Sequence, residues 1–240
     1  RDRPTLERVE GLVRRAEDDE HAEDLAARAQ RGMDDARARE RGILGLDDAH
    51  ARLLQGQKNK IQGYNLPQGV ISKLYRSCAA GSPGLFTKVG LHTYVDPRLG
   101  GGKVNSVTTE DIVKQVEVDG VEWLFYKATP IDVALIRATS ADPSGNLSME
   151  KECLTLDVLA QAMAAHNNGG IVIAQVERIV EQGSIKPKDV KVPGILVDCV
   201  VVADDPVMHR MNYGVMYNPA LSGEIRMPVG AMPKMELDER

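Results

Sequence analysis

Hydrophobic and polar positions form strand-like and helix-like patterns from residue 58 to residue 205. Branched and aromatic side chains dominate three short runs, which predict strands at Leu85–Thr87, Trp123–Tyr126 and Val133–Ile136. Two longer runs, Ile171–Val176 and Ile195–Val202, are almost continuously apolar. Runs of this kind are typical of strands that are covered on both faces in a parallel sheet.

Two stretches with helical spacing lie among these runs. Pro67 can take the first position of a helix that ends before Gly81, with an apolar face made of Val70, Ile71, Leu74, Tyr75 and Cys78. Thr155 is expected to cap a second helix, which Asn168–Gly170 ends. The apolar face expected for it consists of Leu156, Leu159, Ala162 and Met163. Because helices alternate with strands, the pattern predicts an α/β fold class, with an open, mostly parallel sheet flanked by helices.

The two flanks of this region differ from it in composition. Residues 1–57 are rich in Arg, Asp and Glu and contain few large apolar residues. We expect one short amphipathic helix around Leu6–Val13, followed by exposed helix or disorder, because so little apolar surface cannot offset the entropy of ordering. Several prolines interrupt residues 206–240, which predicts an extended arm or linker. The predicted organisation is therefore a charged segment at 1–57, an α/β domain at 58–205 and an arm at 206–240.

Composition narrows the function classes. A net charge of -5 without a basic stripe argues against nucleic-acid binding. No apolar run reaches the roughly 18 to 20 residues that a membrane span needs. The three cysteines lie far apart and no two histidines have metal-ligand spacing, so we expect neither a disulfide framework nor a metal site. With Arg1 in first place and no signal-like apolar segment after it, we expect an internal or processed start and a cytoplasmic protein.

Three local patterns have both a structural and a chemical interpretation. Gly100–Gly102 follows Pro97 and Arg98 rather than a strand, which favours a flexible surface loop over a phosphate cradle. Glu181–Gly183 could lift a nucleophile onto a sharp turn, but the charges before it favour a helix end. Cys153 and Cys199 stand beside apolar residues, as small buried side chains do. Composition and spacing alone therefore indicate no more than a soluble α/β domain.

Longer motifs carry a resemblance to a known family. They read NKIQGYNLPQGVISKLYR from Asn59, GLFTKVGLHTYVDPRLGGGKVNS from Gly84, PIDVALIRATSADPSGNLSMEKE from Pro130, GGIVIAQVERIV from Gly169, IKPKDVKVPGILVDCVVVA from Ile185 and YNPALSGEIR from Tyr217. Residues 59–240 resemble the first domain of the family I coenzyme A transferases, of the acetate or propionate CoA-transferase type. Residues 1–57 do not match, since the family's glycine-rich first unit is missing there. That segment is either frameshifted or foreign, or a natural divergence.

The resemblance implies a reaction and a set of site residues. In the family, an acyl group passes from coenzyme A to a glutamate, coenzyme A then forms a glutamyl thioester, and a second carboxylic acid takes the coenzyme. Gln68 matches the family glutamine whose amide helps to form the oxyanion site, and a role confined to its turn is the alternative. Candidate substrate-binding residues are Asn65, Gly69, Gly90 and His92, with His92 in place of a family glycine. Coenzyme A is thus expected as a thioester substrate, with no bound cofactor.

The catalytic glutamate of the family has no counterpart in this chain. None of Glu150, Glu152, Glu177 and Glu181 matches it, and Glu150 and Glu152 are expected to be exposed ahead of a helix. We therefore expect a partial acyl-CoA:carboxylate CoA-transferase that is inactive alone. Its partners would be an acyl-CoA, a short-chain carboxylate and a complementary second domain or subunit, in a homo-oligomer. The alternatives are a non-catalytic binding or assembly subunit that retains the fold, and a phosphosugar isomerase-like protein.

Overall fold

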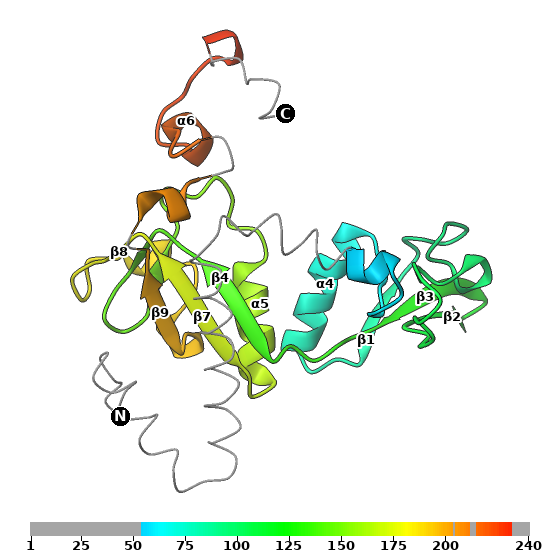
Figure 1. Ribbon diagram of the computed structural model, residues 1–240. Helices are drawn as coiled ribbons and strands as arrows, with labels where there is room; N and C mark the ends of the chain where they lie inside the picture. The colour runs from blue at the N-terminus through cyan, green and yellow to red at the C-terminus, as the bar shows by residue number, and fades with distance from the viewer. Residues whose placement is uncertain (1–53, 204, 212–214, 232–240) are drawn as a thin grey trace, which may run out of the picture.

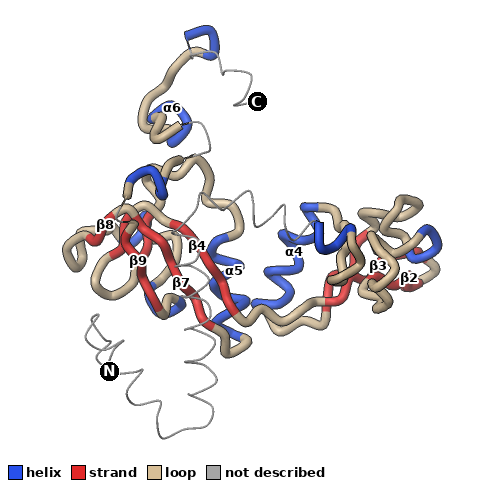
Figure 2. Tube along the Cα trace, viewed as in Figure 1, coloured by secondary structure: helices blue, strands red, loops and turns tan. Residues whose placement is uncertain are grey.

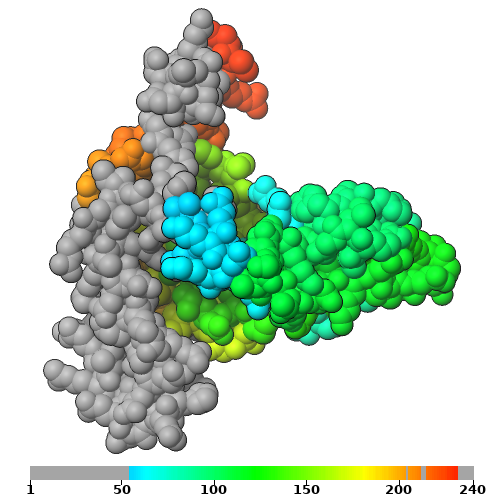
Figure 3. Space-filling view, turned by 45° about the vertical axis from the view of Figure 1, so that its right-hand side comes forward, coloured from blue at the N-terminus to red at the C-terminus, as the bar shows by residue number. Residues whose placement is uncertain are grey.

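The computed structural model of the protein describes residues 54–203, 205–211 and 215–231, so the helix expected around Leu6–Val13 lies outside the described residues. Figure 1 shows one lobe around α5, a second lobe around β3, and an arm that leaves the first lobe at its top. The tube in Figure 2 shows that strands and long helices belong to the two lobes, whereas the arm is mostly loop. In the space-filling view of Figure 3, the second lobe projects from the rest of the molecule.

The first lobe, called the parallel lobe below, is a three-stranded parallel sheet with a helix on one face. The strand order is β4 (Val133–Arg137), β7 (Ile171–Val176) and β9 (Cys199–Val202). The helix α5 (Val158–Asn167) connects β4 to β7 and packs against both strands. Its buried residues are Ala160, Ala162, Ala164 and Ala165. A parallel sheet with a crossover helix confirms the predicted α/β fold class.

The second lobe, called the antiparallel lobe, contains a three-stranded sheet, of which the sequence pattern predicts two strands. Its strand order is β1 (Gly84–Thr87), β3 (Val121–Lys127) and β2 (Val113–Val118), with antiparallel pairing throughout. The helix α4 (Gln68–Ala79) covers this lobe beside β1. The core between helix and sheet consists of Val70, Val95, Val113, Leu124 and Tyr126.

The remaining elements are short. A third, mixed sheet has the strand order β6 (Leu147–Ser148), β5 (Ser140–Ala141) and β8 (Arg178–Ile179). The arm contains the four-residue helix α6 (Pro219–Ser222). Turns of 3-10 helix occupy Pro97–Leu99, Pro187–Asp189, Gly194–Leu196, Pro206–His209 and Val229–Ala231.

Contacts between α4 and α5 join the two lobes. Arg76 of α4 forms an ion pair of 2.7 Å with Asp157, the residue before α5. At the other end of α5, the Asn167 amide donates a 2.6 Å hydrogen bond to the carbonyl of Ala79. Both ends of α5 are therefore tied to α4, which also packs against β1 of the antiparallel lobe.

The structure corrects the expected start and apolar face of α5. The helix begins at Val158 after Asp157, with no side-chain cap, so Thr155 is not the cap. Leu156 lies before the helix with a positive φ of 43° and is 72% exposed, and Leu159 is 40% exposed. Of the expected face, Ala162 is buried, and Ala160, Ala164 and Ala165 complete the buried face of the helix.

Three further expectations about local structure were wrong. Pro67 is the residue before α4 rather than its first residue. The run Ile195–Val202 forms a strand only over Cys199–Val202, and Val201 and Val202 are 47% and 40% exposed because β9 is an edge strand. Glu181–Gly183 lies in a turn after β8 and not at a helix end, since β7 and β8 occupy the residues before it.

Candidate functional site

The start of α4 presents hydrogen-bond donors to solvent. Gln68 is the first residue of the helix and is exposed, as is Gly69. The carbonyl of Pro67 accepts from the N–H groups of Val70 and Ile71, at 2.9 and 3.1 Å. The preceding N–H groups of Gln68 and Gly69 have no acceptor among the described residues. Since a helix start carries a partial positive charge, these groups and the Gln68 amide suit a developing negative charge.

The turn before α4 rests on the loop of residues 90–102, which we call the glycine loop. The Asn65 N–H donates a 2.8 Å hydrogen bond to the carbonyl of Gly102. The hydroxyl of Tyr94 lies 3.5 Å from Asn65 Oδ1. Gly102 has a φ of 75°, and a Cβ atom there would lie 2.8 Å from the Asn65 carbonyl oxygen. This close approach fixes the turn that leads to Gln68.

Asp96 organises the glycine loop from its interior. Its carboxylate is buried and accepts hydrogen bonds from the N–H of His92 at 2.8 Å and the N–H of Arg98 at 3.0 Å. The Arg98 guanidinium adds bonds of 2.8 and 2.6 Å. These bonds from Arg98 hold the pKa of Asp96 well below its usual range, although burial opposes them. Asp96 therefore stays ionised and keeps the loop in one conformation.

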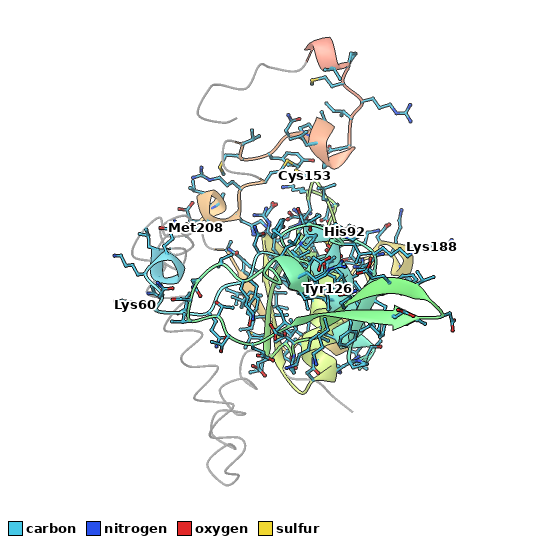
Figure 4. The ribbon with its side chains drawn as sticks, turned by 90° about the vertical axis from the view of Figure 1, so that its right-hand side faces the viewer. Lys60, His92, Tyr126, Cys153, Lys188 and Met208 are labelled. Atoms are coloured by element: carbon cyan, nitrogen blue, oxygen red, sulfur yellow. The ribbon has the colours of Figure 1, made fainter. Side chains whose placement is uncertain are left out.

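Gly90 and His92 both have a positive φ in the same loop. A Cβ atom on Gly90 would lie 2.3 Å from Val95 and 2.5 Å from the hydroxyl of Tyr126, so only glycine fits. Burial raises the pKa of Tyr126 to about 12, and its hydroxyl donates to the Val89 carbonyl at 2.8 Å. His92 is exposed, with a φ of 60°. Figure 4 shows His92 above Tyr126 in the lobe that faces the viewer.

The structure thus brings together some of the expected site residues. Asn65, Gln68 and Gly69 are consecutive parts of one turn and helix start, and Asn65 contacts the glycine loop that contains Gly90 and His92. No hydrogen bond joins Gln68 or Gly69 to that loop in the part of the chain that is described.

The expectation of a flexible loop at Gly100–Gly102 was wrong. All three glycines have positive φ, and Gly101 and Gly102 are buried. The N–H groups of Gly101 and Gly102 donate to the carbonyls of Asp96 and Tyr94, both at 3.0 Å. Because these donors are used inside the loop, they do not form a phosphate cradle, and the glycines serve a tightly folded turn.

A second polar group, which the sequence analysis missed, lies where the arm meets the parallel sheet. Arg137 ends β4, and its Nε donates to both carboxylate oxygens of Glu152 at 3.1 and 3.0 Å. Its other nitrogens donate to the carbonyls of Arg210 and His209, at 2.7 and 3.3 Å. Arg137 therefore holds the base of the arm against the carboxyl edge of the sheet.

A cavity of about 180 Å³ lies within this second group. Lys151 reaches both oxygens of Glu177 at 2.6 and 2.9 Å, and its ammonium lies 5.3 Å from the ring centre of Tyr217. The ring of His209 is buried, and its Nε2 is 3.6 Å from Glu152 Oε1. Arg137 and Glu177 could have been suspected from the sequence, because Arg137 is the last residue of β4 and Glu177 follows β7, and α/β folds bind ligands at the carboxyl ends of parallel strands.

The structure also corrects the expected exposure of Glu152, whose side chain is only 10% exposed. Burial alone would raise its pKa, but His209 and Arg137 outweigh burial, so the pKa of Glu152 is lowered. Glu150 is exposed as expected, and accepts from Ser140, Ser148 and Arg178 at 2.6, 2.7 and 2.8 Å. These carboxylates are therefore engaged in stabilising contacts rather than standing free.

The described residues lack two other kinds of feature. No grouping of three or more His, Cys, Asp or Glu side chains within them could hold a metal ion. No helix among them has the length and apolar character needed to cross a membrane.

Comparison with known proteins identifies the family. The sequence model of the family described as "Coenzyme A transferase" matches residues 49–203. The chain therefore belongs to the coenzyme A transferase family, as its motifs and its α/β fold had indicated.

Individual relatives are similar over most of this chain. It is 53% identical to the caffeate CoA-transferase of Acetobacterium woodii over 181 residues, which is 75% of this chain and 34% of that protein. It is 44% identical to the acetate CoA-transferase YdiF of Escherichia coli K12 over 184 residues, or 77% of this chain and 34% of that protein. The chain thus spans about a third of the length of these relatives.

One solved structure adds a likeness in three dimensions. The thioester complex with CoA of the acyl-CoA transferase YdiF from Escherichia coli O157:H7 superimposes with a TM-score of 0.69 and 46% sequence identity. The alignment covers 72% of this chain and 33% of that one.

Proposed function

We propose that this chain contributes the first-domain half of the active site in a CoA-transferase that moves coenzyme A between short-chain carboxylic acids. The observation that carries the proposal is the start of α4, where the Gln68 amide and two unpaired N–H groups face solvent. A carboxylate that attacks a thioester carbonyl creates a tetrahedral oxyanion before the carbon–sulfur bond breaks and the thiolate leaves. Donors fixed in advance stabilise that charge, and a helix start reinforces them.

Each candidate residue has a distinct role in this proposal. Gln68 donates to the thioester oxygen, and Gly69 adds a backbone N–H and leaves open space beside it. Asn65 lines the substrate side of the turn. Gly90 and His92 act through the glycine loop, where Gly90 allows the close packing on Tyr126 and His92 narrows the entrance with an exposed imidazole.

The nucleophile of the proposed reaction is a glutamate outside this chain. The relatives are about three times as long as the region that matches this chain. This difference in length supports the proposal that the reaction also needs residues equivalent to the unmatched two-thirds of the relatives. We propose that a complementary domain or subunit supplies them, in a cytoplasmic homo-oligomer that acts in short-chain fatty acid or ketone body metabolism. Names such as acetate CoA-transferase and caffeate CoA-transferase, borne by the relatives, support a carboxylic acid as acceptor. Coenzyme A enters as the thioester substrate.

Complementation tests the proposal directly. The chain is incubated with acetyl-CoA and propionate, alone and with the remaining two-thirds of the YdiF polypeptide, and propionyl-CoA is measured. We expect no product and no coenzyme A adduct on Glu150, Glu152, Glu177 or Glu181 without the complement, and transfer with it. A stable complex that transfers nothing would contradict the proposal and favour a non-catalytic assembly subunit. A stoichiometric adduct on one of the four glutamates in the chain alone would contradict the assignment of the nucleophile.

A further inference from the structure

The end of α4 and the start of α5 border a cavity of about 410 Å³, which we call the α4–α5 cavity. Figure 1 shows the two helices side by side, and contacts between them join the lobes. Pockets that bind small molecules typically measure about 300–1,000 Å³, so the cavity is large enough for a small ligand. A helix rises by about 1.5 Å per residue, which places Ala79, the last residue of α4, about 16 Å from Gln68. The α4–α5 cavity is therefore separate from the proposed oxyanion site.

Most of the wall of the α4–α5 cavity is apolar. Two of its leucines are exposed to solvent, Leu156 at 72% and Leu159 at 40%. Covering them with an apolar group would remove their side chains from water, which is favourable. The body of a ligand that fits this cavity is therefore apolar. The apolar wall includes Ala79 and Ala80 at the end of α4 and Leu156, Val158, Leu159 and Met163 at the start of α5.

The backbone of Leu156 supports a binding role for the cavity. Its φ of 43° lies in the left-handed region, which residues other than glycine rarely adopt. Packing in the protein core does not compensate for this strain, because the side chain is exposed. Strained residues cluster at ligand sites, where the bound group gives the unfavourable conformation a function. A ligand that covers Leu156 would account for a leucine held in this conformation at a cavity wall.

The polar side chains of the cavity wall are cationic or hydroxylic. Arg76, Thr155 and Lys191 line the cavity, and no carboxylate is among the described residues that do so. The nearby carboxylate of Asp157 is already engaged by Arg76 at 2.7 Å. Hydrogen bonds from Ser72 and Arg76 lower the pKa of Asp157, so this carboxylate is ionised and its charge is balanced by Arg76. Lys191 therefore gives the cavity an excess of positive charge.

Lys191 is fixed in place but its ammonium has no partner within the described part of the chain. Its N–H donates a 2.8 Å hydrogen bond to the carbonyl of Leu147, and the next residue, Val192, is 1% exposed in the core. Glu150 and Asp189 border a neighbouring cavity that Lys191 also lines, but neither forms an ion pair with it. A neutral apolar occupant would cover this charge without compensating it, which is unfavourable. The occupant is therefore expected to carry a negative charge.

The walls of the cavity are held together without a ligand. The ion pair of Arg76 with Asp157 joins α4 to the start of α5, and the hydrogen bond from Asn167 to the Ala79 carbonyl joins their ends. A cavity that already exists in the free protein spares a ligand the cost of ordering its walls.

We propose that the α4–α5 cavity is a second ligand site, which binds a carboxylic acid with a medium-length alkyl or aryl body. The carboxylate pairs with Lys191 and with the nitrogens of Arg76 that Asp157 does not use. The apolar body lies on Leu156 and its neighbours in the wall. Because the site is separate from Gln68, this inference does not depend on the proposed function.

Matched ligands test the two features of the site in the full chain. Isothermal titration calorimetry is carried out with octanoate as the probe, and with 1-octanol, octylammonium and acetate. We expect saturable binding of one octanoate per chain, severalfold weaker binding of 1-octanol, which lacks the charge, and no binding of acetate, which lacks the chain. Each added CH₂ group in a series of carboxylates is expected to tighten binding up to about fourfold until the cavity is full. Octylammonium binding as tight as that of octanoate, or no saturable binding of octanoate, would overturn the inference.

Lys191→Gln tests the charge. We expect it to weaken octanoate binding about three- to fivefold, since a partly exposed ion pair is lost, and to leave 1-octanol binding unchanged. The difference between parent and variant is expected to shrink at high salt. Lys114→Gln, at an exposed lysine of β2, makes the same change away from the cavity and serves as the matched control. Equal octanoate affinity of the parent and Lys191→Gln at low salt would refute the role of Lys191.

Leu156→Ala tests the apolar wall. Loss of the contact that its side chain makes is expected to weaken octanoate binding about fivefold or more. The matched control is Leu154→Ala, because Leu154 is 65% exposed only two residues away but does not line the cavity. Equal affinities of these two variants for octanoate would contradict the proposed site.

A bulky side chain distinguishes the cavity from other surfaces. Ala80→Trp fills the cavity from the end of α4 and is expected to abolish octanoate binding. Ala231→Trp, at an exposed alanine of the arm, is expected to leave binding unchanged. Octanoate binding that persists in Ala80→Trp would overturn the inference. Concentration-dependent association that Ala80→Trp abolishes and octanoate does not inhibit would assign the cavity to a second copy of the chain, and would also overturn it.

Discussion

The proposed chemistry depends most on the side-chain amide of Gln68. Removing one preorganised oxyanion donor lowers turnover by about 10² to 10³, or roughly 3–4 kcal/mol. We expect Gln68→Ala to lower kcat by that amount in the complemented enzyme while the thermal midpoint stays within about a degree, because Gln68 is exposed. Gln55→Ala, also exposed, is the matched control. A loss below threefold would assign Gln68 to its turn alone.

Asp96 is expected to stabilise the glycine loop more than any exposed carboxylate does. A hydrogen bond to a charged group contributes about 1.5–3 kcal/mol, and a buried acceptor that loses its charge forfeits much of that value. We expect Asp96→Asn to lower the free energy of unfolding by about 2 kcal/mol, measured with urea. Asp119→Asn in the exposed β2–β3 turn makes the same chemical change and is expected to have little effect. Equal effects of the two substitutions would contradict this role.

The stability contributed by Asp96 has a definite pH dependence. Arg98 lowers the pKa of the folded carboxyl, so the unfolded chain binds the proton more readily. The contribution is therefore complete above the unfolded pKa of about 3.9 and is lost as the pH falls toward the folded pKa. We expect the stability difference between the parent and Asp96→Asn to be constant from neutral pH to about pH 4 and to shrink below it. A difference that is unchanged at about pH 3 would contradict the assignment.

At the level of elements, Leu156 distinguishes the observed start of α5 from the expected one. A non-glycine residue in the left-handed region is strained by about 1–2 kcal/mol, which a change to glycine relieves. The same change costs about 0.5–1 kcal/mol, because glycine loses more backbone entropy on folding. Because Leu156 is 72% exposed with a φ of 43°, we expect Leu156→Gly to be neutral or slightly stabilising. Leu124→Ala in the core is expected to lose about 2–5 kcal/mol. A similar loss of stability for Leu156→Gly would contradict this expectation and indicate that Leu156 is buried on a helix face.

Elements with strong local patterns could be predicted from the sequence, and the others could not. The sequence analysis found β1, β3, β4, β7 and α4 because each has an apolar or periodic run. It overlooked the β2–β3 hairpin, although Asp119 and Gly120 form a two-residue turn with positive φ at both positions, a strong hairpin signal. The two-residue strands β5, β6 and β8 have no pattern of their own, since their pairing depends on tertiary contacts.

The residues of the candidate site also divide into those that a local motif predicts and those that only the tertiary structure reveals. Asn65, Gln68 and Gly69 could be proposed because they lie in one motif, and the structure places them together. The hydrogen bond from Arg137 to the Arg210 carbonyl joins residues that are 73 positions apart, and no local sequence pattern predicts it. Asp96 was overlooked for a similar reason, because its importance comes from burial and from the partners it gathers.

At the scale of the whole molecule, the face of the parallel sheet opposite α5 exposes several large apolar side chains. Strand alternation places Val133, Leu135, Ile173 and Val201 on that face. Val133, Leu135 and Val201 are 45%, 62% and 47% exposed. Parallel sheets are normally covered on both faces, and large exposed apolar patches mark interaction surfaces.

Because this face and the edge strands β4 and β9 are open, we expect the purified chain to self-associate at micromolar concentration. Light scattering across a dilution series measures the association. Leu135→Lys places a charge on the open face and is expected to shift the chain toward monomer, since burying an unpaired charge is unfavourable. Leu154→Lys, at a site that is 65% exposed and outside the strands, makes the same change and is expected to leave association unaltered. A parent chain that remains a cooperatively melting monomer at these concentrations would show that the open face does not drive association.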